Sequence, residues 1–240
     1  MRIVTRYWFV AALLAVLGFA ALSVDLPTAR WALRKESPEV LSKPAYLAET
    51  FADGIGVLMI LIAIYVIDRR RPETLPRVIA CALGAGAAAN VFKMFVARTR
   101  PDRFLFDGGV WATFRDWLPG ASAGTLGQSF PSAHMATATG FAIGLAWLYP
   151  RGRWVFAAFA LLAGAQRIVA NKHYLSDVCW GAALGCLVGL ACVQSTRLSR
   201  WFDRLEAGLR PRLTWYNRVS DVPVATPSPG VSAARNTRAA

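Results

Sequence analysis

Apolar residues in this chain fall into long blocks that are separated by shorter polar segments. The six blocks cover residues 7–24, 50–67, 75–97, 133–149, 154–170 and 178–193. Each is close to the roughly 20 residues that a helix needs to cross the hydrocarbon core of a bilayer. The blocks are apolar throughout, whereas a surface helix is apolar on one face only. The pattern predicts an all-α, polytopic membrane protein, a six-transmembrane-helix bundle with interfacial helices.

The first block has two interpretations. Arg2 and Arg6 precede it, and the small residues at Ala21-Leu22-Ser23 resemble a signal-peptidase site. The block is therefore either a first span or a cleaved signal, and we interpret it as a span. In both cases the residues before it are cytoplasmic and the rest of the topology is unchanged.

The polar segments between the blocks differ in length. Residues 25–49 form a mixed-charge connection that could hold a helix on the membrane surface, and Asp53 at the start of the second block is expected at the interface. The connection from Arg98 to Pro131 is long and contains several aromatic residues. Loops of this length in a compact protein are uncommon and often functional.

The C-terminal region is basic. Five large apolar residues recur there at roughly helical spacing, which predicts an amphipathic surface helix over residues 195–212: Leu198, Trp201, Phe202, Leu205 and Leu209. We assign residues 1–212 to a single membrane-embedded domain. Residues 213–240 are predicted to be a disordered tail, because their end is rich in Pro, Ser, Ala and Thr.

Composition agrees with a membrane protein. The chain has 55% hydrophobic residues, a mean hydropathy of +0.39 and a net charge of +13. In a soluble protein such a charge would indicate nucleic acid, but here much of it lies in short loops, where it suits topology signals and anionic lipids. We expect no nucleic-acid partner. The four cysteines lie inside apolar blocks and are expected to be free thiols.

The basic residues also predict an orientation. Basic residues are slightly more numerous in the segments on the same side as the two termini than in the opposite connections. The difference widens when Arg100 and Arg167 are set aside as site residues. The positive-inside rule then places both termini in the cytoplasm. We expect the bacterial inner membrane, with the opposite connections facing the periplasm.

Three polar clusters stand at the ends of apolar blocks, and all are expected on that outer side. The first cluster closes the third block: Lys93 lies within the block, and Arg100-Pro101 follows. A charge inside a membrane is costly and tends to be functional. Taken alone, the cluster also fits a snorkelling lysine beside interfacial arginines.

The second cluster opens the fourth block. Pro131 favours an extended Phe130, which makes Ser132 a candidate N-cap for the following helix. The N–H groups of Ala133 and His134 would then point out of the helix start and form an anion site. An ordinary cap with an interfacial histidine is the alternative.

The third cluster joins the fifth and sixth blocks. If the sixth helix begins near His173, then His173 and Asp177 share one of its faces. A carboxylate on one imidazole nitrogen fixes the tautomer and leaves the other nitrogen free as a nucleophile. Arg167 can hold an oxyanion through two N–H groups. An interfacial ion pair is the alternative.

The combination favours chemistry over these alternatives. The only two histidines in the chain, an intramembrane lysine, two arginines and a helix start are expected on one membrane face. Cations and N–H donors for three oxygens, with a nucleophile and an acid, are what phosphoryl transfer needs. The histidines lie apart in the sequence and no carboxylate cluster accompanies them, so we expect no metal and no other cofactor.

At these residues the sequence resembles the type-2 phosphatidic acid phosphatase superfamily, which also includes vanadium haloperoxidases. The pattern of that superfamily is K-x6-R-P, then P-S-G-H, then S-R-x5-H-x3-D. Here the three motifs read Lys93-x6-Arg100-Pro101, Pro131-Ser132-Ala133-His134 and Gln166-Arg167-x5-His173-x3-Asp177. Their order and spacing agree over residues 93–177.

Two positions depart from the superfamily pattern. Ala133 stands where the pattern has glycine. A positive φ there would cost alanine roughly 1–2 kcal/mol, whereas alanine as the first helical residue keeps its N–H at no cost, and we favour the second case. Gln166 stands where the pattern has serine, which puts a supporting hydrogen bond in question.

The resemblance implies a role for each matched residue. His173 attacks phosphorus and forms a phosphohistidine, Asp177 orients His173, and His134 protonates the leaving oxygen and then activates water. The phosphate is held by the side chains of Lys93, Arg100, Ser132 and Arg167. It is also held by the backbone N–H groups of Ala133 and His134.

The resemblance also implies a substrate class. Membrane-bound members are lipid phosphatases that act on phosphatidic acid, phosphatidylglycerol phosphate, undecaprenyl diphosphate or lipid A phosphate, and the sequence does not select among these. The expected partners are thus a phosphorylated lipid and the bilayer. A lipid-to-lipid phosphotransferase with the same site, or an anion-binding transporter without turnover, are the alternatives. The sequence does not indicate an oligomeric state.

Overall fold

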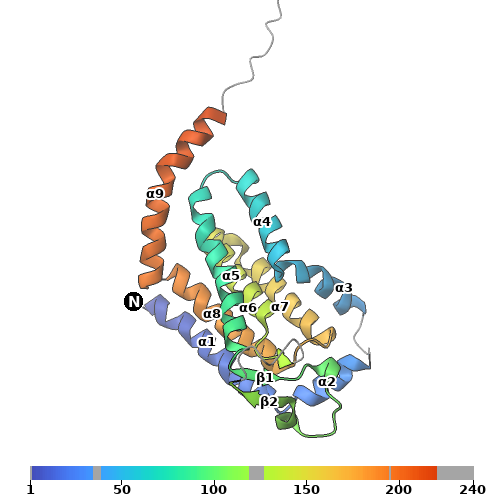
Figure 1. Cartoon of the computed structure of the whole chain (residues 1–240). Helices are drawn as coiled ribbons and strands as arrows, with labels where there is room; N and C mark the ends of the chain where they lie inside the picture. The colour runs from blue at the N-terminus through green and yellow to red at the C-terminus, as the bar shows by residue number, and fades with distance from the viewer. Residues whose placement is uncertain (1, 35–38, 119–126, 195, 221–240) are drawn as a thin grey trace, which may run out of the picture.

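The computed structural model describes residues 2–34, 39–118, 127–194 and 196–220, and these are mostly helical, as predicted (Figure 1). The helices are α1 (Arg2–Ala21), α2 (Asp25–Leu33), α3 (Glu39–Ala48), α4 (Gly54–Ile67), α5 (Leu75–Phe92), α6 (Ala133–Leu148), α7 (Arg153–Val169), α8 (Leu175–Val193) and α9 (Arg197–Ser220).

Helix α6 is the centre of the bundle. It packs against α5, α7 and α8, and most of its residues are buried. Glycines allow this close approach, as small residues do between membrane helices. A Cβ at Gly140 would collide with the carbonyl oxygen of Cys81 in α5, and one at Gly181 in α8 would collide with that of Ser132. The second contact holds the start of α6 against α8.

Three of the predicted spans end or bend differently from the prediction. Helix α5 ends at Phe92 and Lys93 is its C-cap, because residues 96–98 pair as a strand instead of continuing the helix to residue 97. The first apolar block bends by 74° between α1 and α2, and the second by 71° before α4. Asp53 caps α4 by accepting hydrogen bonds from the Ile55 and Gly56 N–H groups.

Among the described residues, two helices are long and apolar enough to cross a membrane, Pro72–Phe92 and Leu175–Val193. The two bent pairs raise the number to four if each is one span, and Ala133–Leu148 is a shorter apolar helix. The described helices thus include candidate spans, while the count of six stays a prediction.

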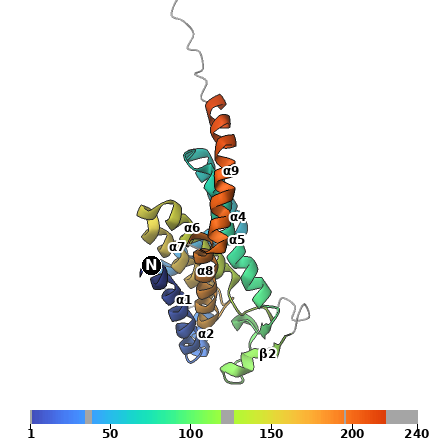
Figure 2. The same cartoon turned by 90° about the vertical axis from the view of Figure 1, so that its left-hand side faces the viewer.

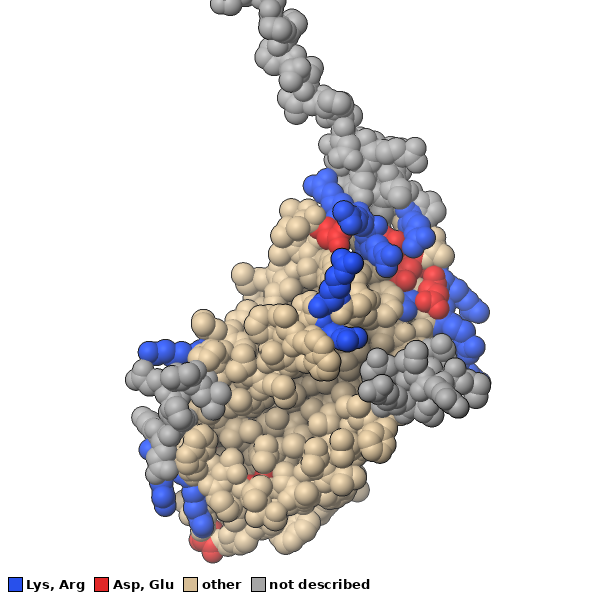
Figure 3. Space-filling view, turned by 180° about the vertical axis from the view of Figure 1, so that it is seen from behind, with Lys and Arg blue, Asp and Glu red and all other residues tan. Residues whose placement is uncertain are grey.

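The molecular surface fits a lipid environment. Figure 3 shows a broad face with few charged side chains over its middle, and Lys and Arg side chains gather toward its upper end and its lower left edge. Helices α1 and α4 expose large apolar side chains, among them Phe9, Val16, Phe19, Ile55, Leu58, Met59 and Ile62.

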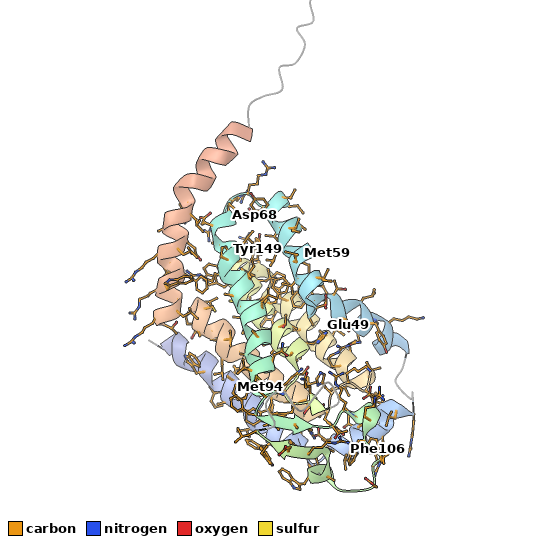
Figure 4. The ribbon with its side chains drawn as sticks, in the orientation of Figure 1. Glu49, Met59, Asp68, Met94, Phe106 and Tyr149 are labelled. Carbon is orange, nitrogen blue, oxygen red and sulfur yellow. The ribbon has the colours of Figure 1, made fainter. Side chains whose placement is uncertain are left out.

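The long connection between α5 and α6 contains a small sheet that was not predicted. Strands β1 (Val96–Arg98) and β2 (Phe114–Trp117) pair antiparallel, with Val96 opposite Trp117 and Arg98 opposite Phe114. Figure 4 places Met94 and Phe106 at the end of the molecule where this connection lies, whereas Asp68 and Tyr149 mark the opposite end. Tyr149 donates a hydrogen bond to Asp68 over 2.9 Å, which links the α4–α5 turn to the end of α6.

Helix α9 is the predicted amphipathic helix, and it continues to Ser220 instead of ending at residue 212. It extends away from the bundle beyond the other helices (Figures 1 and 2). Its first half is attached to α5 by the buried Arg77, which pairs with Asp203 at 2.5 Å and with Glu206 at 2.6 Å. The disordered tail was predicted over residues 213–240, but residues 213–220 belong to this helix. Residues 221–240 lie outside the described residues. The four cysteines are free thiols, as predicted.

Candidate active site

The start of α6 has the capped geometry that the sequence predicts for an anion site. Ser132 is the N-cap, and its hydroxyl accepts the Met135 N–H at 3.3 Å. Ala133 is the first helical residue, and it is absent from the positive-φ residues of the described chain, which are Phe106, Leu118 and Asn171. Alanine therefore fits here without strain. The first N–H groups of a helix point out of it and favour an anion.

The loop between α7 and α8 fixes the position of His173. The Arg167 carbonyl accepts the N–H groups of Lys172 at 3.0 Å and His173 at 3.3 Å. Asn171 turns the chain with a φ of 54°, a conformation that asparagine tolerates better than most residues. The turn leaves His173 only 4% exposed.

The imidazole of His173 is oriented by a main-chain carbonyl. Its Nδ1 lies 2.7 Å from the Ser129 carbonyl oxygen. Because a carbonyl oxygen only accepts, Nδ1 carries the proton and Nε2 keeps its lone pair. Burial lowers the pKa of His173, opposed by Asp177 and assisted by Lys93 and Arg100, so the ring is neutral at pH 7.

Asp177 lies farther from His173 than a direct hydrogen bond requires. Its Oδ2 is 3.8 Å from Nδ1, beyond the usual limit of about 3.2 Å. Three other donors surround its carboxylate: Arg98 Nη1 at 2.5 Å, the Ser129 hydroxyl at 2.6 Å and the Tyr174 N–H at 3.0 Å. The predicted direct contact is thus replaced by one through Ser129, whose hydroxyl binds Asp177 and whose carbonyl binds His173.

Lys93 and Arg100 lie beside this histidine. Lys93 is 9% exposed at the end of α5. Burial, together with the charge of Arg100, lowers its pKa to about 8, with Asp177 opposing the shift. The Nε atom of Arg100 is buried and has no hydrogen-bond partner among the described residues. Such a donor calls for an explanation, and an anion in the site supplies one.

Arg167 is oriented by two neighbours. Its Nη2 donates to Glu49 Oε1 and its Nε to Gln166 Oε1, each over 2.5 Å, and Gln166 Nε2 donates to Glu49 Oε2 over 2.9 Å. Glu49 belongs to the one-turn helix η1 (Glu49–Phe51) at the bend before α4 (Figure 4). Gln166 therefore does supply a hydrogen bond to the arginine next to it.

The three sequence clusters converge at one place. The charges of Arg167, His173 and Lys93 all act on the His134 side chain, and those of Lys93 and Arg100 act on His173. The Ser132 N–H donates to the Asp177 carbonyl at 3.0 Å, which joins the second cluster to the third. A neutral imidazole nitrogen, a second imidazole, three cations and a helix start thus surround one site, a set that can hold and transfer a phosphoryl group.

Sequence reasoning missed several residues that support the site. The sequence places Arg98 at the start of the long connection after the third block and Glu49 in the polar connection before the second. Ser129 precedes the second motif by two residues and carries no charge to draw notice. Only their contacts in three dimensions identify them, although Arg98 directly follows an apolar block, which is a weak signal of burial.

Comparisons with curated proteins find relatives that match part of the chain. The chain is 37% identical over 106 residues to the lipid A 1-phosphatase of Rhizobium johnstonii, covering 44% of this chain and 41% of the relative. It is 37% identical over 101 residues to that of Rhizobium etli, covering 42% and 41%. It is 44% identical over 70 residues to that of Porphyromonas gingivalis, covering 28% and 16%. The matches thus span less than half the length of these curated relatives.

Two further comparisons concern the fold and the family. The crystal structure of Aquifex aeolicus LpxE aligns with a TM-score of 0.49 at 18% identity, covering 71% of this chain and 95% of that one. The family model of the PAP2 superfamily matches residues 74–201, just over half of the chain. This match includes all three motifs, and the chain belongs to the PAP2 superfamily.

Proposed function

We propose that this chain is an integral membrane phosphatase that removes phosphate from a lipid through a phosphohistidine at His173. The observation that carries the proposal is the orientation of this buried imidazole. The Ser129 carbonyl, 2.7 Å from Nδ1, leaves Nε2 free next to groups that can hold a phosphate. A neutral, oriented imidazole with a free lone pair is suited to attack phosphorus.

The first chemical step forms the covalent intermediate. The Nε2 lone pair of His173 attacks phosphorus and the bond from phosphorus to the lipid oxygen breaks. His134 gives its proton to that oxygen. The ring of His173 becomes positive, and the Asp177 carboxylate, 3.8 Å from Nδ1, stabilises that charge. Lys93, Arg100, Arg167, the Ser132 hydroxyl and the N–H groups of Ala133 and His134 hold the phosphoryl oxygens.

The second step releases phosphate. His134, now neutral, takes a proton from water as the water oxygen attacks phosphorus. The bond from phosphorus to Nε2 breaks, and inorganic phosphate leaves. Both histidines return to their starting protonation states, so the cycle needs no metal or other cofactor.

For the substrate, we propose a phosphorylated membrane lipid, with the 1-phosphate of lipid A as the first candidate. The curated relatives are lipid A 1-phosphatases, which favours this candidate over phosphatidic acid, phosphatidylglycerol phosphate and undecaprenyl diphosphate. The candidate spans and the apolar surfaces of α1 and α4 suit a substrate that arrives from the bilayer.

The proposal includes an orientation. The chain crosses the bacterial inner membrane six times, both termini are cytoplasmic and the site faces the periplasm. Tyr149 and Met94 lie toward opposite ends of the molecule (Figure 4), which supports an arrangement with one end on each side of the membrane. The basic α9 lies on the cytoplasmic side in this scheme.

The test is phosphate release by purified protein in detergent from the four lipids, with His173→Ala as the control. We expect release from at least one lipid by the wild type and none by the variant. A newly phosphorylated lipid without free phosphate would instead indicate a phosphotransferase. Binding of the lipids without turnover would exclude both enzymes and leave an anion carrier.

A second experiment tests the metal-free mechanism. Activity is expected to persist in EDTA, and vanadate should inhibit because it adopts the five-coordinate geometry of the transition state that Lys93, Arg100 and Arg167 hold. Activity that disappears in EDTA and returns with magnesium or zinc would contradict this mechanism.

A further inference from the structure

Arg98 lies inside the protein next to the site, at a position of the first motif that the superfamily pattern leaves unspecified. Its side chain is 0% exposed, as are those of its two acidic partners, Asp25 and Asp177. Its Nη2 donates to Asp25 at 2.7 Å and its Nη1 to Asp177 at 2.5 Å. Asp25 stands at the start of α2, directly after the bend that follows α1.

The guanidinium is satisfied on its edges and on its faces. Its Nε donates to the Thr113 hydroxyl at 3.0 Å, and its Nη1 also donates to the Ser176 hydroxyl at 2.7 Å. The rings of Tyr174 and Phe114 lie 4.1 Å and 4.5 Å from its central carbon. Burying a charge is costly unless it is paired and hydrogen-bonded, and four polar side chains here meet that condition.

The network connects Arg98 to the nucleophile. Its side chain holds Oδ1 of Asp177, and its main-chain carbonyl accepts the Ser129 N–H at 3.1 Å. Ser129 in turn donates its hydroxyl to Asp177 Oδ2 at 2.6 Å and accepts His173 Nδ1 at 2.7 Å. Arg98 therefore contacts both residues that define the orientation of His173.

We propose that Arg98 is a positioning residue for the nucleophile, with Asp25 as its second counter-ion. Arg98 holds Asp177 and Ser129 in place, so that the proton of His173 stays on Nδ1 and Nε2 stays free. Asp25 fixes the other side of the guanidinium and so connects the bend between α1 and α2 to the site. The inference rests on the proposed function and adds two residues to its machinery.

The chain contains a matched control for the burial of an arginine. Arg77 is 2% exposed, pairs with Asp203 and Glu206, and lies against the rings of Trp147 and Phe202. It thus has the same kind of surroundings as Arg98, two carboxylates and two aromatic faces. Its partners belong to α9 and not to the site, so a purely structural role for a buried arginine can be measured at Arg77.

The first experiment compares Arg98→Met with Arg77→Met. Both variants are expected to lose thermal stability. Per folded molecule, Arg98→Met should lower kcat for lipid phosphate by about 100-fold, because small displacements of a reacting group have effects of that size, with KM changed by less than about threefold, since the phosphate-binding groups remain. Arg77→Met should keep kcat within about twofold of the wild type by the same reasoning. Equal kcat in the two variants would overturn the inference.

A second readout does not depend on turnover. The chain has two histidines, so nitrogen NMR of labelled imidazole in detergent gives two ring systems, which His134→Ala and His173→Ala assign. The wild type and Arg77→Met should show the Nδ1–H tautomer at His173, and Arg98→Met should show a mixture of tautomers. An unchanged tautomer in Arg98→Met would overturn the inference even if no lipid is hydrolysed, whereas absent phosphate release by the wild type concerns the proposed function alone.

Asp25→Asn provides a milder variant if Arg98→Met does not fold. The amide keeps the volume of the side chain but removes one counter-ion. Its single oxygen cannot replace both carboxylate oxygens, of which one accepts the Ser176 N–H at 2.9 Å and the other accepts Arg98 Nη2 at 2.7 Å. We expect a roughly tenfold loss of kcat with little change of KM, the same sign as for Arg98 but smaller. A wild-type kcat and a wild-type His173 tautomer in this variant would contradict the role of Asp25.

Discussion

The two histidines are expected to differ in how strongly the effect of their removal depends on the leaving group of the substrate. A lipid alkoxide is a poor leaving group that needs a proton in the transition state, whereas nitrophenolate leaves with little help. General acid catalysis contributes about 10²- to 10⁴-fold. His134→Ala is therefore expected to lose far more activity on a lipid phosphate than on p-nitrophenyl phosphate. Rates of phosphoenzyme formation on both substrates, measured by rapid quench, check this.

His173→Ala should lose activity equally on both substrates, because in the proposed mechanism no other group forms the covalent intermediate. Acid-labile phosphoenzyme should be absent in this variant and should accumulate in His134→Ala, where activation of water also fails. Substantial turnover by His173→Ala, with no phosphoenzyme in His134→Ala on either substrate, would mean that the two roles are reversed.

The lowered pKa of Lys93 predicts that substrate capture weakens at alkaline pH. Burial, together with the charge of Arg100, lowers its pKa to about 8, so its positive charge is present below that pH and is lost as the pH rises through it. A phosphate dianion binds the charged form better, and kcat/KM reports ionisations of the free enzyme. We expect kcat/KM to fall above a pH of about 8, and Lys93→Arg, which stays charged, to move this fall to higher pH.

Lys172→Arg is the control for this pH profile. The Lys172 side chain is 44% exposed and pairs with Asp102 at 2.8 Å, so its replacement should leave the alkaline limb where it is. If Lys93→Arg also leaves that limb unchanged, a different group sets the limit.

Among the elements, the contact of α6 with α8 decides where the anion site lies. A Cβ at Gly181 would collide with the Ser132 carbonyl and lie 3.2 Å from the Met135 Cβ. Gly181→Ala must therefore shift the start of α6, and overpacking of this kind costs roughly 1–3 kcal/mol. We expect a lower thermal midpoint in detergent and reduced phosphate release. Gly54→Ala is the control, because nothing lies within 4 Å of its added Cβ; equal behaviour of the two variants would contradict the role of this contact.

The elements also show what a sequence pattern can and cannot determine. Apolar blocks identify helices well, because burial in lipid and burial in protein select the same residues. They do not show a bend, so the 74° change of direction before Asp25 was missed. The end of α5 was placed too late because residues 93–97 are mostly apolar, and strand pairing with residues 114–117, distant in sequence, ends the helix instead.

For the whole molecule, the proposed orientation can be tested with reporter fusions. Fusions after Arg71 and after Arg153 are expected to report the cytoplasm, because both sites lie in Arg-rich turns that the positive-inside rule retains there. A fusion after the exposed Gly109, in the connection that carries the small sheet, should report the periplasm. A cytoplasmic signal at Gly109 would reverse the side on which the site lies.

The site was predicted in its motif residues and missed in their supports. Their places at the ends of apolar blocks, together with the family resemblance, brought Lys93, Arg100, His134 and Arg167 into one hypothesis. The structure brings these residues near His173. The supports could not be inferred, because hydrogen bonds such as that of Ser129 to His173 depend on the path of the main chain. The expected direct contact of Asp177 with the imidazole likewise gave way to Arg98, a competitor that sequence spacing does not reveal.

Two of the acidic residues that pair with arginines at the site lie outside the segment that matches the family model. The PAP2 superfamily match covers residues 74–201 and includes Arg98 and Arg167, whereas their partners Asp25 and Glu49 precede it. The segment that matches the family model is thus paired with two negative charges from residues that precede it. A chimera that joins this segment to the N-terminal region of another protein must bring two carboxylates to the same places to keep both arginine pairs.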